Sequence, residues 1–521
     1  MKKFFLTLIT ILSTSMLWAQ ENSINSFKPE QLNWYNKDIK TDKILGIGVD
    51  KAYSTLLTNL KPKKTVVVAV IDGGVDINHE DLQGKIWVNT KEIPGNNIDD
   101  DKNGYVDDIH GWNFIGNRTG ENVIYENYEY TRILKQENHA SYNKAKEQYE
   151  KELKKNQTEK QNIEKFEDLY LKIKALIKDA TGIDVKNESD LAKVNSDDDM
   201  VKKAKEFLAE RYKMGFTESM LTKLKERNHE ISNYFLNKDF DARKIIGDNP
   251  ADINDRNYGN SDVKGPRANH GTGVAGLIAA NRNNNIGING VTNNVLIMAI
   301  RTTPNGDERD KDVALGIIYA ADNGADVINM SFGKAFSPQK ELVDQAVKYA
   351  ESKGVLMIHS AGNSGENIDV TESFPTPYYK TGGKATNWIT IGASENKLGK
   401  TTPAVFSNYG AKNVDLFAPG VDIVSLDTTN TYSMNSGTSF SGPIVSGVAA
   451  LVLSYYPDLT PQQVIEILME SSYKPKGPKM LVPDTENEKR KKAKFKTLSV
   501  SGGVVDAYAA LQLAEKKYGK R

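Results

Sequence analysis

Cysteine is absent from the 521 residues of the chain. Disulfide bonds, thiolate zinc sites, cysteine nucleophiles and a lipidated N-terminal cysteine are therefore excluded. An excess of charge of either sign is also missing, because 68 Lys and Arg balance 68 Asp and Glu. Without a net positive charge there is no bulk electrostatic attraction to nucleic acid, so we expect no nucleic-acid partner. The remaining composition, 39% hydrophobic and 26% charged, is ordinary for a soluble globular protein.

Long hydrophobic runs are scarce as well, and the one that stands out is at the N-terminus. The apolar run Phe4–Trp18 follows Lys2 and Lys3 and ends before Ala19. It is too short to cross a bilayer, and its flanks are typical of a secretory signal peptide, which we predict over residues 1–19. No later stretch is apolar enough to span a membrane. We expect an exported protein, periplasmic or extracellular after cleavage.

Two glycine-rich blocks alternate short apolar runs with helical patterns. The run 65–71 is continuous and β-branched, as in a strand buried on both faces of a parallel sheet. Further strands are predicted at 295–300, 326–330, 355–360, 388–393 and 415–418, and helices at 311–323, 339–353, 442–455 and 461–471. This alternation predicts an α/β fold, a doubly wound and mostly parallel sheet with helices on both faces.

Residues 120–262 differ from both blocks, because Lys, Glu, Asn and Tyr dominate and glycine almost disappears. Apolar residues at helical spacing, such as Ile163, Phe166 and Tyr170, favour a lobe of amphipathic helices over a disordered charged linker. The predicted division is a signal peptide (1–19), an N-terminal segment (20–60), the first part of the α/β domain (61–119), a helical insertion (120–262), the second part of the α/β domain (263–515) and a basic tail (516–521).

Three segments each place a reactive side chain beside glycines. Asp72 follows the first strand in Asp72-Gly73-Gly74, His270 lies in Asn269-His270-Gly271, and Ser439 lies in Gly437-Thr438-Ser439. Taken singly, such an Asp is usually a turn residue and such a Ser usually a helix cap. Loops at the carboxyl ends of parallel strands converge, however, and together the three would form a relay. His270 would take the proton of Ser439, and Asp72 would orient the imidazole.

A fourth segment, Ser360-Ala361-Gly362-Asn363, follows another predicted strand. There the Asn363 amide is placed to donate to a developing oxyanion, together with the backbone N–H of Ser439.

The four segments, in this order, resemble the subtilisin-like serine proteases, or subtilases, over roughly residues 44–119 and 263–515. The resemblance implies peptide-bond hydrolysis through an acyl-enzyme, with protein or peptide substrates. It identifies Asp72, His270 and Ser439 as catalytic residues and Asn363 as the oxyanion donor. The substrate-binding positions that it implies are Ser331, Phe332, Gly333, Ser360, Ala361 and Gly362. The alternative is a catalytically silent pseudoprotease that binds peptides or partners; the intact triad disfavours it.

The chain departs from compact subtilases in three respects. Asp72 and His270 lie 198 residues apart because of the insertion, and Ser441 stands where the family commonly has Ala. No ordinary propeptide is expected before residue 61. The insertion is expected either to gate the substrate cleft or to act as a chaperone in place of that propeptide, while a binding surface without a catalytic role is the third alternative.

An acidic loop at 99–108 places oxygen ligands at alternate positions around Gly104, as calcium loops do. It is not an EF-hand, because His110 stands where a bidentate Glu is required. Many subtilases hold structural calcium, so we predict Ca²⁺ bound by Asp99, Asp101, Asn103 and Asp107. A solvated acidic turn is the alternative. No catalytic cofactor is expected, and the sequence does not determine the oligomeric state or the side-chain specificity.

Overall fold

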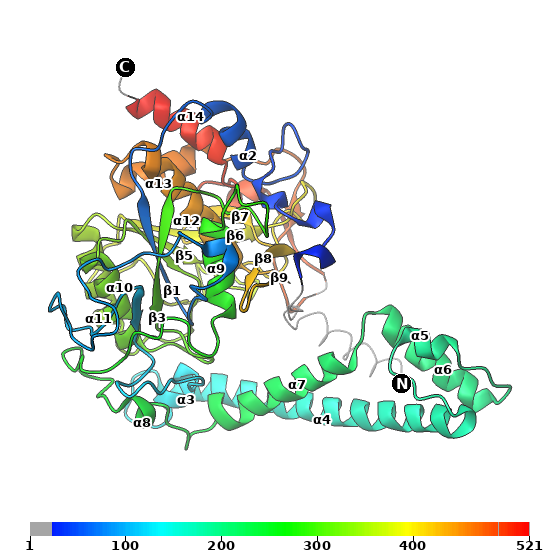
Figure 1. Ribbon diagram of the computed structural model, residues 1–521. Coiled ribbons are helices and arrows are strands. Elements are labelled where there is room, and N and C mark those ends of the chain that lie inside the picture. Colours follow the sequence, from blue (N-terminus) through cyan, green and yellow to red (C-terminus); the bar gives the residue numbers. More distant parts are fainter. Residues whose placement is uncertain (1–22, 488, 520–521) are drawn as a thin grey trace. The chain divides into compact units, whose positions relative to one another are not determined.

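The computed structural model describes residues 23–487 and 489–519, so the predicted signal peptide lies outside the described residues. The chain divides into two compact units. One unit, the helical unit, is Asn127–Asp241, within the predicted insertion. The other, the α/β unit, holds the described residues before Asn127 and after Asp241 (Figure 1).

The α/β unit is built on a seven-stranded sheet in the order β2-β3-β1-β4-β5-β6-β7, with every neighbouring pair parallel. The strands are β1 (Val66–Asp72), β2 (Gly111–Asn113), β3 (Val295–Arg301), β4 (Val327–Met330), β5 (Leu356–Ser360), β6 (Trp388–Ser394) and β7 (Leu416–Pro419). Nearly every residue in them is buried, because a parallel sheet is covered on both faces. The predicted α/β fold with a parallel sheet is confirmed.

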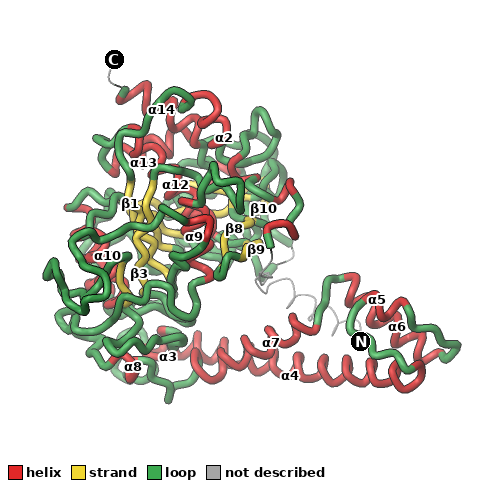
Figure 2. Tube along the Cα trace, viewed as in Figure 1, coloured by secondary structure: helices red, strands yellow, loops and turns green. Residues whose placement is uncertain are grey.

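Helices cover both faces of this sheet (Figures 1 and 2). Val66, Val68 and Val70 of β1 share a hydrophobic core with α9 and α12. On the opposite face, a Cβ at Gly316 of α10 would lie 3.7 Å from Ile71. The helices of this unit are α2 (Val49–Lys51), α8 (Arg243–Ile246), α9 (Asn269–Ala279), α10 (Asp310–Asp322), α11 (Lys340–Ser352), α12 (Thr438–Tyr455), α13 (Pro461–Ser471) and α14 (Ala507–Tyr518). The alternation of side chains along β1 thus produces two separate helical layers.

Five short strands were not predicted from the sequence: β2, the antiparallel hairpin of β8 (Ile423–Asp427) and β9 (Thr431–Asn435), and the antiparallel pair β10 (Met480–Leu481) and β11 (Lys492–Ala493). The N-terminal segment packs into the α/β core, where Trp34 and Tyr35 are buried. The Trp34 indole N–H donates to the Asp422 carbonyl at 3.1 Å.

Helix α12 begins at Thr438, four residues earlier than the predicted start at Gly442. The early start leaves Pro443 inside the helix, where its ring nitrogen cannot donate to the Ser439 carbonyl. The Ser331 hydroxyl donates to that carbonyl instead, at 3.0 Å. A hydrogen bond from outside the helix therefore replaces the one that proline removes.

Helix α12 is the one described helix long and apolar enough to cross a membrane, and 89% of it is buried inside the protein. That burial is typical of the core helix of a globular domain.

The helical unit consists of α3 (Glu129–Ile133), α4 (Tyr142–Thr181), α5 (Glu188–Ala192), α6 (Asp199–Lys213) and α7 (Glu218–Glu230), the last extended by a π-helical turn, η6 (Ile231–Phe235). Helix α4 packs against both α6 and α7. Ile163 and Tyr170 of its apolar stripe are buried, whereas Leu169 is 42% exposed. Gly182 ends α4 with a φ of 73°, in the left-handed region that favours glycine.

Candidate active site

Asp72 is the last residue of β1, and His270 is the second residue of α9. His270 Nδ1 lies 2.9 Å from each carboxylate oxygen of Asp72. The backbone N–H of Gly73 also donates to Asp72 Oδ1, at 2.7 Å. The two groups can approach because residue 271 is glycine: a Cβ there would lie 2.1 Å from the Gly74 carbonyl oxygen. The structure therefore brings together the first two residues that the sequence singled out.

The two side chains differ in exposure, since Asp72 is 4% and His270 37% exposed. Burial alone would lower the pKa of the imidazole. The charge of Asp72 and its hydrogen bond outweigh that effect and raise the pKa of His270 above its usual 6.5. The ring also packs edge-on against Phe440, with centroids 5.7 Å apart. Phe440 directly follows Ser439, so this contact holds the imidazole beside the start of α12.

Ser439 is the second residue of α12. Its hydroxyl donates to the Ser331 carbonyl oxygen at 3.3 Å. Its backbone N–H lies in the first turn of the helix, where an intrahelical acceptor does not exist. That N–H and the positive end of the helix dipole are both suited to stabilising an anion.

Asn363 is held by the turn before Ser439. Its Oδ1 accepts hydrogen bonds from the backbone N–H and the hydroxyl of Thr438, at 2.8 and 2.9 Å. With the oxygen occupied in this way, the Nδ2 group is left to donate, and within the described part of the chain it has no acceptor. The turn requires glycine at residue 362, because its φ is 101° and a Cβ there would lie 2.5 Å from the Asn408 side chain.

The predicted substrate-binding residues lie around these groups. Ser331, Phe332 and Gly333 continue the chain beyond β4. The Ser360 hydroxyl donates to the Thr438 carbonyl at 2.9 Å, and Ala361 and Gly362 lead directly to Asn363. Ser331 and Ser360, at the ends of the neighbouring strands β4 and β5, thus both contact the start of α12.

The acidic loop gathers only part of the predicted calcium ligands. Carboxylate oxygens of Asp99 and Asp101 lie within 4.8 Å of each other and of Glu92, a residue that the sequence analysis did not include. The Asp107 carboxylate instead accepts the backbone N–H groups of Gly95 and Asn97. Asn103 Oδ1 accepts the N–H of Tyr105, and the Asn103 backbone N–H donates to Asp99 and Asp101, so Asn103 lies beside the cluster. Three carboxylates this close have the charge and the oxygen donors that Ca²⁺ prefers.

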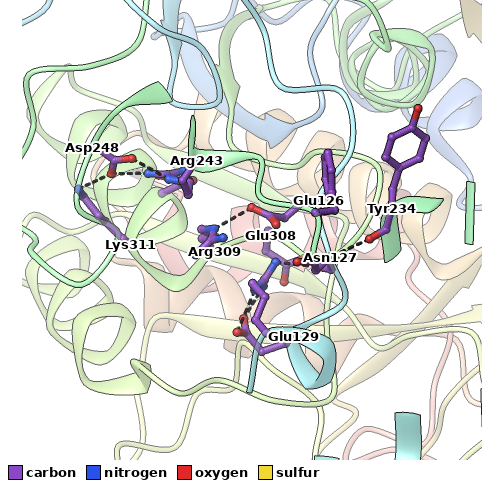
Figure 3. A network of polar contacts seen from close by, with 12 residues as sticks. Glu126, Asn127, Glu129, Tyr234, Arg243, Asp248, Glu308, Arg309 and Lys311 are labelled. Atoms are coloured by element: carbon purple, nitrogen blue, oxygen red, sulfur yellow. Dashed lines mark hydrogen bonds and ion pairs between the residues drawn. The ribbon is translucent and has the colours of Figure 1, made fainter. Parts of the chain in front are cut away.

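A buried ion network lies elsewhere in the α/β unit (Figure 3). Arg243 pairs with Asp248 and, at 2.7 Å, with Asp312, while the Lys311 ammonium lies 2.6 Å from Asp248. All four side chains are at most 6% exposed. The charges compensate one another, which is the condition for burying them.

The chain is similar in sequence to known serine proteinases and subtilisins. The chain is 41% identical over 223 residues to the thermophilic serine proteinase of Bacillus sp. (strain AK1), covering 42% of this chain and 49% of that protein. It is 38% identical to subtilisin DY of Bacillus licheniformis over 37% of this chain and 67% of that one. The matched region therefore spans about half to two thirds of these relatives.

Among solved structures, proteases from Pseudoalteromonas arctica PAMC 21717 match with 27% identity and a TM-score of 0.40, over 51% of this chain and 82% of that one. The model of the subtilase family matches residues 63–501, most of the chain. The chain belongs to the subtilase family.

Proposed function

We propose that this protein is an exported serine endopeptidase that hydrolyses peptide bonds of extended polypeptides. The single observation that supports this best is the 2.9 Å contact between His270 Nδ1 and Asp72 beside the start of α12, which carries Ser439. The names of the relatives, which are serine proteinases and subtilisins, agree with the proposal. Export rests on the predicted signal peptide at residues 1–19.

In the proposed mechanism Ser439 is the nucleophile. Its hydroxyl hydrogen turns from the Ser331 carbonyl to His270 Nε2, and Oγ attacks the substrate carbonyl carbon as His270 takes the proton. Asp72 accepts the hydrogen bond of Nδ1–H throughout, which fixes the tautomer and stabilises the imidazolium. His270 then protonates the leaving amine. In the second half of the reaction, His270 takes a proton from a water molecule that attacks the acyl-enzyme, and then returns the proton to Ser439 Oγ as the acid product leaves.

The oxyanion of the tetrahedral intermediate is assigned to two donors, Asn363 Nδ2 and the N–H of Ser439. Both are held before substrate arrives, one by Thr438 and the other by the helix, so little reorganisation accompanies the charge as it develops. The Ser331–Gly333 and Ser360–Gly362 segments are proposed to bind the substrate backbone on either side.

The test is labelling of the mature protein with a fluorophosphonate, followed by mass spectrometry of the modified peptide. Labelling at Ser439, abolished by Ser439→Ala, is expected. A folded protein that is neither labelled nor active on casein would support the pseudoprotease alternative instead.

We further propose that Glu92, Asp99 and Asp101 bind a structural Ca²⁺. The subtilase family commonly holds such ions, and the distances among these carboxylates suit one. The ion would cross-link residues 92–101 and neutralise three adjacent negative charges. It has no role in the chemical steps.

For the helical unit, the two earlier hypotheses give opposite results on deletion of residues 127–241 with a short linker between Glu126 and Ala242. A soluble enzyme with broader substrate range would support a gate. An inactive aggregate that regains activity when the helical unit is present during refolding would support a chaperone.

A further inference from the structure

One row of residues crosses three strands at the carboxyl end of β1. Asp72 of β1 pairs in register with Arg301, the last residue of β3, and Arg301 pairs in turn with Asn113, the last residue of β2. Strands β1 and β3 lie side by side in the sheet (Figure 1). Arg301 therefore lies between the proposed catalytic carboxylate and the edge of the sheet, and the proposed mechanism gives it no role.

Arg301 is a buried cation, with a side chain only 1% exposed. Its hydrogen bonds go to uncharged oxygens: Nε donates to the Gly73 carbonyl at 2.9 Å, and Nη1 donates to Asn122 Oδ1 at 2.8 Å and to the Asp262 carbonyl at 3.1 Å. The Asp262 carboxylate is 4.0 Å away and 43% exposed, so it compensates the charge only weakly. Burial lowers the pKa of Arg301 to about 10, which leaves it charged at neutral pH. Because desolvating a guanidinium costs free energy, stability alone is a poor explanation for this residue.

The carbonyl that Arg301 Nε contacts belongs to the residue directly after Asp72. The backbone N–H of Gly73 donates to Asp72 Oδ1 at 2.7 Å, and the Gly73 carbonyl accepts from Arg301. Gly73 is thus held at both of its polar groups, at one by the carboxylate and at the other by the guanidinium. The hydrogen bond from Arg301 therefore restrains the backbone exactly where a donor to the carboxylate is placed.

The same turn touches the helix that carries His270. A Cβ at Gly271 would lie 2.1 Å from the Gly74 carbonyl oxygen and 3.1 Å from the Cβ of Asp72. With packing this close, a displacement of the turn changes the position of Asp72 relative to His270. Hydrogen bonds weaken as their distance and angle depart from the optimum, so such a displacement would weaken the 2.9 Å contact with His270 Nδ1.

We propose that Arg301 is a positioning residue for the proposed peptidase reaction: through the Gly73 carbonyl, it holds the Asp72 carboxylate against His270 Nδ1. The inference rests on the proposed function and adds to it a residue that acts only through Asp72. The alternative is that Arg301 merely fastens to the sheet the two segments that precede and follow the helical unit in sequence.

The test is a matched pair of substitutions, Arg301→Gln and Arg301→Met. Both side chains are uncharged, and both lack the Nη1 donor. The amide nitrogen of glutamine stands at the same place along the side chain as Nε of arginine, where methionine has its methyl group. Only Arg301→Gln can therefore keep the hydrogen bond to the Gly73 carbonyl, so the pair isolates that bond from the charge.

Arg301→Met should lower kcat by about 10²-fold with KM unchanged, as for a catalytic group misplaced by about 1 Å. The acidic limb of kcat/KM should also move to lower pH, because Asp72 then raises the pKa of His270 less. Arg301→Gln should keep nearly the wild-type kcat and acidic limb. Equal behaviour of the two variants would overturn the proposal. Failure of either variant to fold would also overturn it, because Arg301 would then serve the fold.

Arg243→Met is the control, because it makes the same change at another buried arginine of the α/β unit, one that pairs with Asp248 and Asp312. It should lower stability but leave kcat, KM and the acidic limb of the folded enzyme unchanged. A control that reproduced the losses of Arg301→Met would show that destabilisation alone causes them.

NMR titration of isotope-labelled histidine, with His270→Gln for assignment, measures the pKa of His270 without any substrate. A lower pKa in Arg301→Met than in Arg301→Gln is expected, and equal values would refute the positioning role whatever the activity. If the expected difference appears in a protein that fluorophosphonate does not label, the positioning role stands and the peptidase function is refuted.

Discussion

His270 Nδ1 lies 2.9 Å from both carboxylate oxygens of Asp72, although the two residues are 198 positions apart in the chain. The contact joins the end of β1 to the start of α9, and the whole helical unit is inserted between them in sequence. Because the carboxylate is buried and the imidazole is partly exposed, one nitrogen of the ring faces a fixed negative charge. The charge of Asp72 raises the proton affinity of the other ring nitrogen, Nε2.

The first prediction concerns the pH dependence of kcat/KM. The general base must be neutral, and Asp72 raises the pKa of His270 above 6.5. Activity should therefore increase with pH as the pH passes through this raised pKa. In Asp72→Asn the charge that raises the pKa is gone, so the acidic limb should move to lower pH while kcat falls by about 10⁴-fold, the size seen for the same change in the equivalent triad of an unrelated fold. An acidic limb at the same pH in both proteins would show that His270 is not the titrating base.

The Asp72–His270 pair also stabilises the folded state, and this stabilisation decreases as the pH rises, whereas the activity increases. The folded-state pKa of His270 exceeds the unfolded value, so the ion pair stabilises the fold fully below pH 6.5 and less as pH rises through the raised pKa. Chemical unfolding of wild type and Asp72→Asn at several pH values measures this. The difference in unfolding free energy between them should shrink toward alkaline pH.

The second prediction concerns the oxyanion donor. Asn363→Ala removes Nδ2 but also the oxygen that accepts from Thr438, so Asn363→Asp, which keeps an oxygen there, is the matched variant. Asn363→Ala should lower kcat by about 10²–10³-fold with little change in KM, the magnitude measured for the equivalent loss in subtilisin, and Asn363→Asp should lower kcat at least as much because its carboxylate also repels the oxyanion. An increase in KM at unchanged kcat would assign Asn363 to ground-state binding instead.

The third prediction concerns calcium. If Ca²⁺ binds Glu92, Asp99 and Asp101, a free Ca²⁺ concentration of 100 times Kd should stabilise the fold by about 2.7 kcal/mol and raise Tm by about 2–4 °C. Chelation should reverse this shift. Asp101→Asn should abolish the response to Ca²⁺, while Asp107→Asn should retain it, because the Asp107 carboxylate lies outside the cluster of Glu92, Asp99 and Asp101. Equal loss of the response in both variants would favour the original set of ligands.

The fourth prediction concerns the buried ion network of Figure 3. Arg243→Met leaves Asp312 and Asp248 buried with fewer cations, which should lower the unfolding free energy by about 3–5 kcal/mol. Lys380→Met breaks the ion pair with Glu341 in the same α/β unit, whose partners are 58% and 46% exposed, so its effect should stay below about 1 kcal/mol.

The measurement for this fourth prediction is tryptophan fluorescence during urea unfolding. Every tryptophan of the chain lies outside residues 127–241, so the signal reports the α/β unit alone. Similar destabilisation by both variants would show that burial does not govern the strength of these pairs.

Much of the fold was predictable because parallel strands buried on both faces leave continuous apolar runs. Six of the seven strands were found in that way, whereas β2 has only three residues and no such run. The start of α12 was misplaced because Pro443 argues against a helix that extends before it. The Ser331 hydroxyl, which comes from a distant segment, donates to the Ser439 carbonyl the hydrogen bond that Pro443 cannot donate.

The sequence alone determined the candidate triad, since Asp72, His270 and Ser439 each stand in a glycine-rich motif that close backbone packing requires. Only the tertiary structure determined which other groups gather. Glu92 joins the acidic cluster from outside the loop, and His359 of β5 lies 2.9 Å from the Phe332 carbonyl oxygen beyond the end of β4. Local sequence encodes the backbone conformation, but the proximity of isolated side chains depends on how separate segments pack, and no local pattern records that.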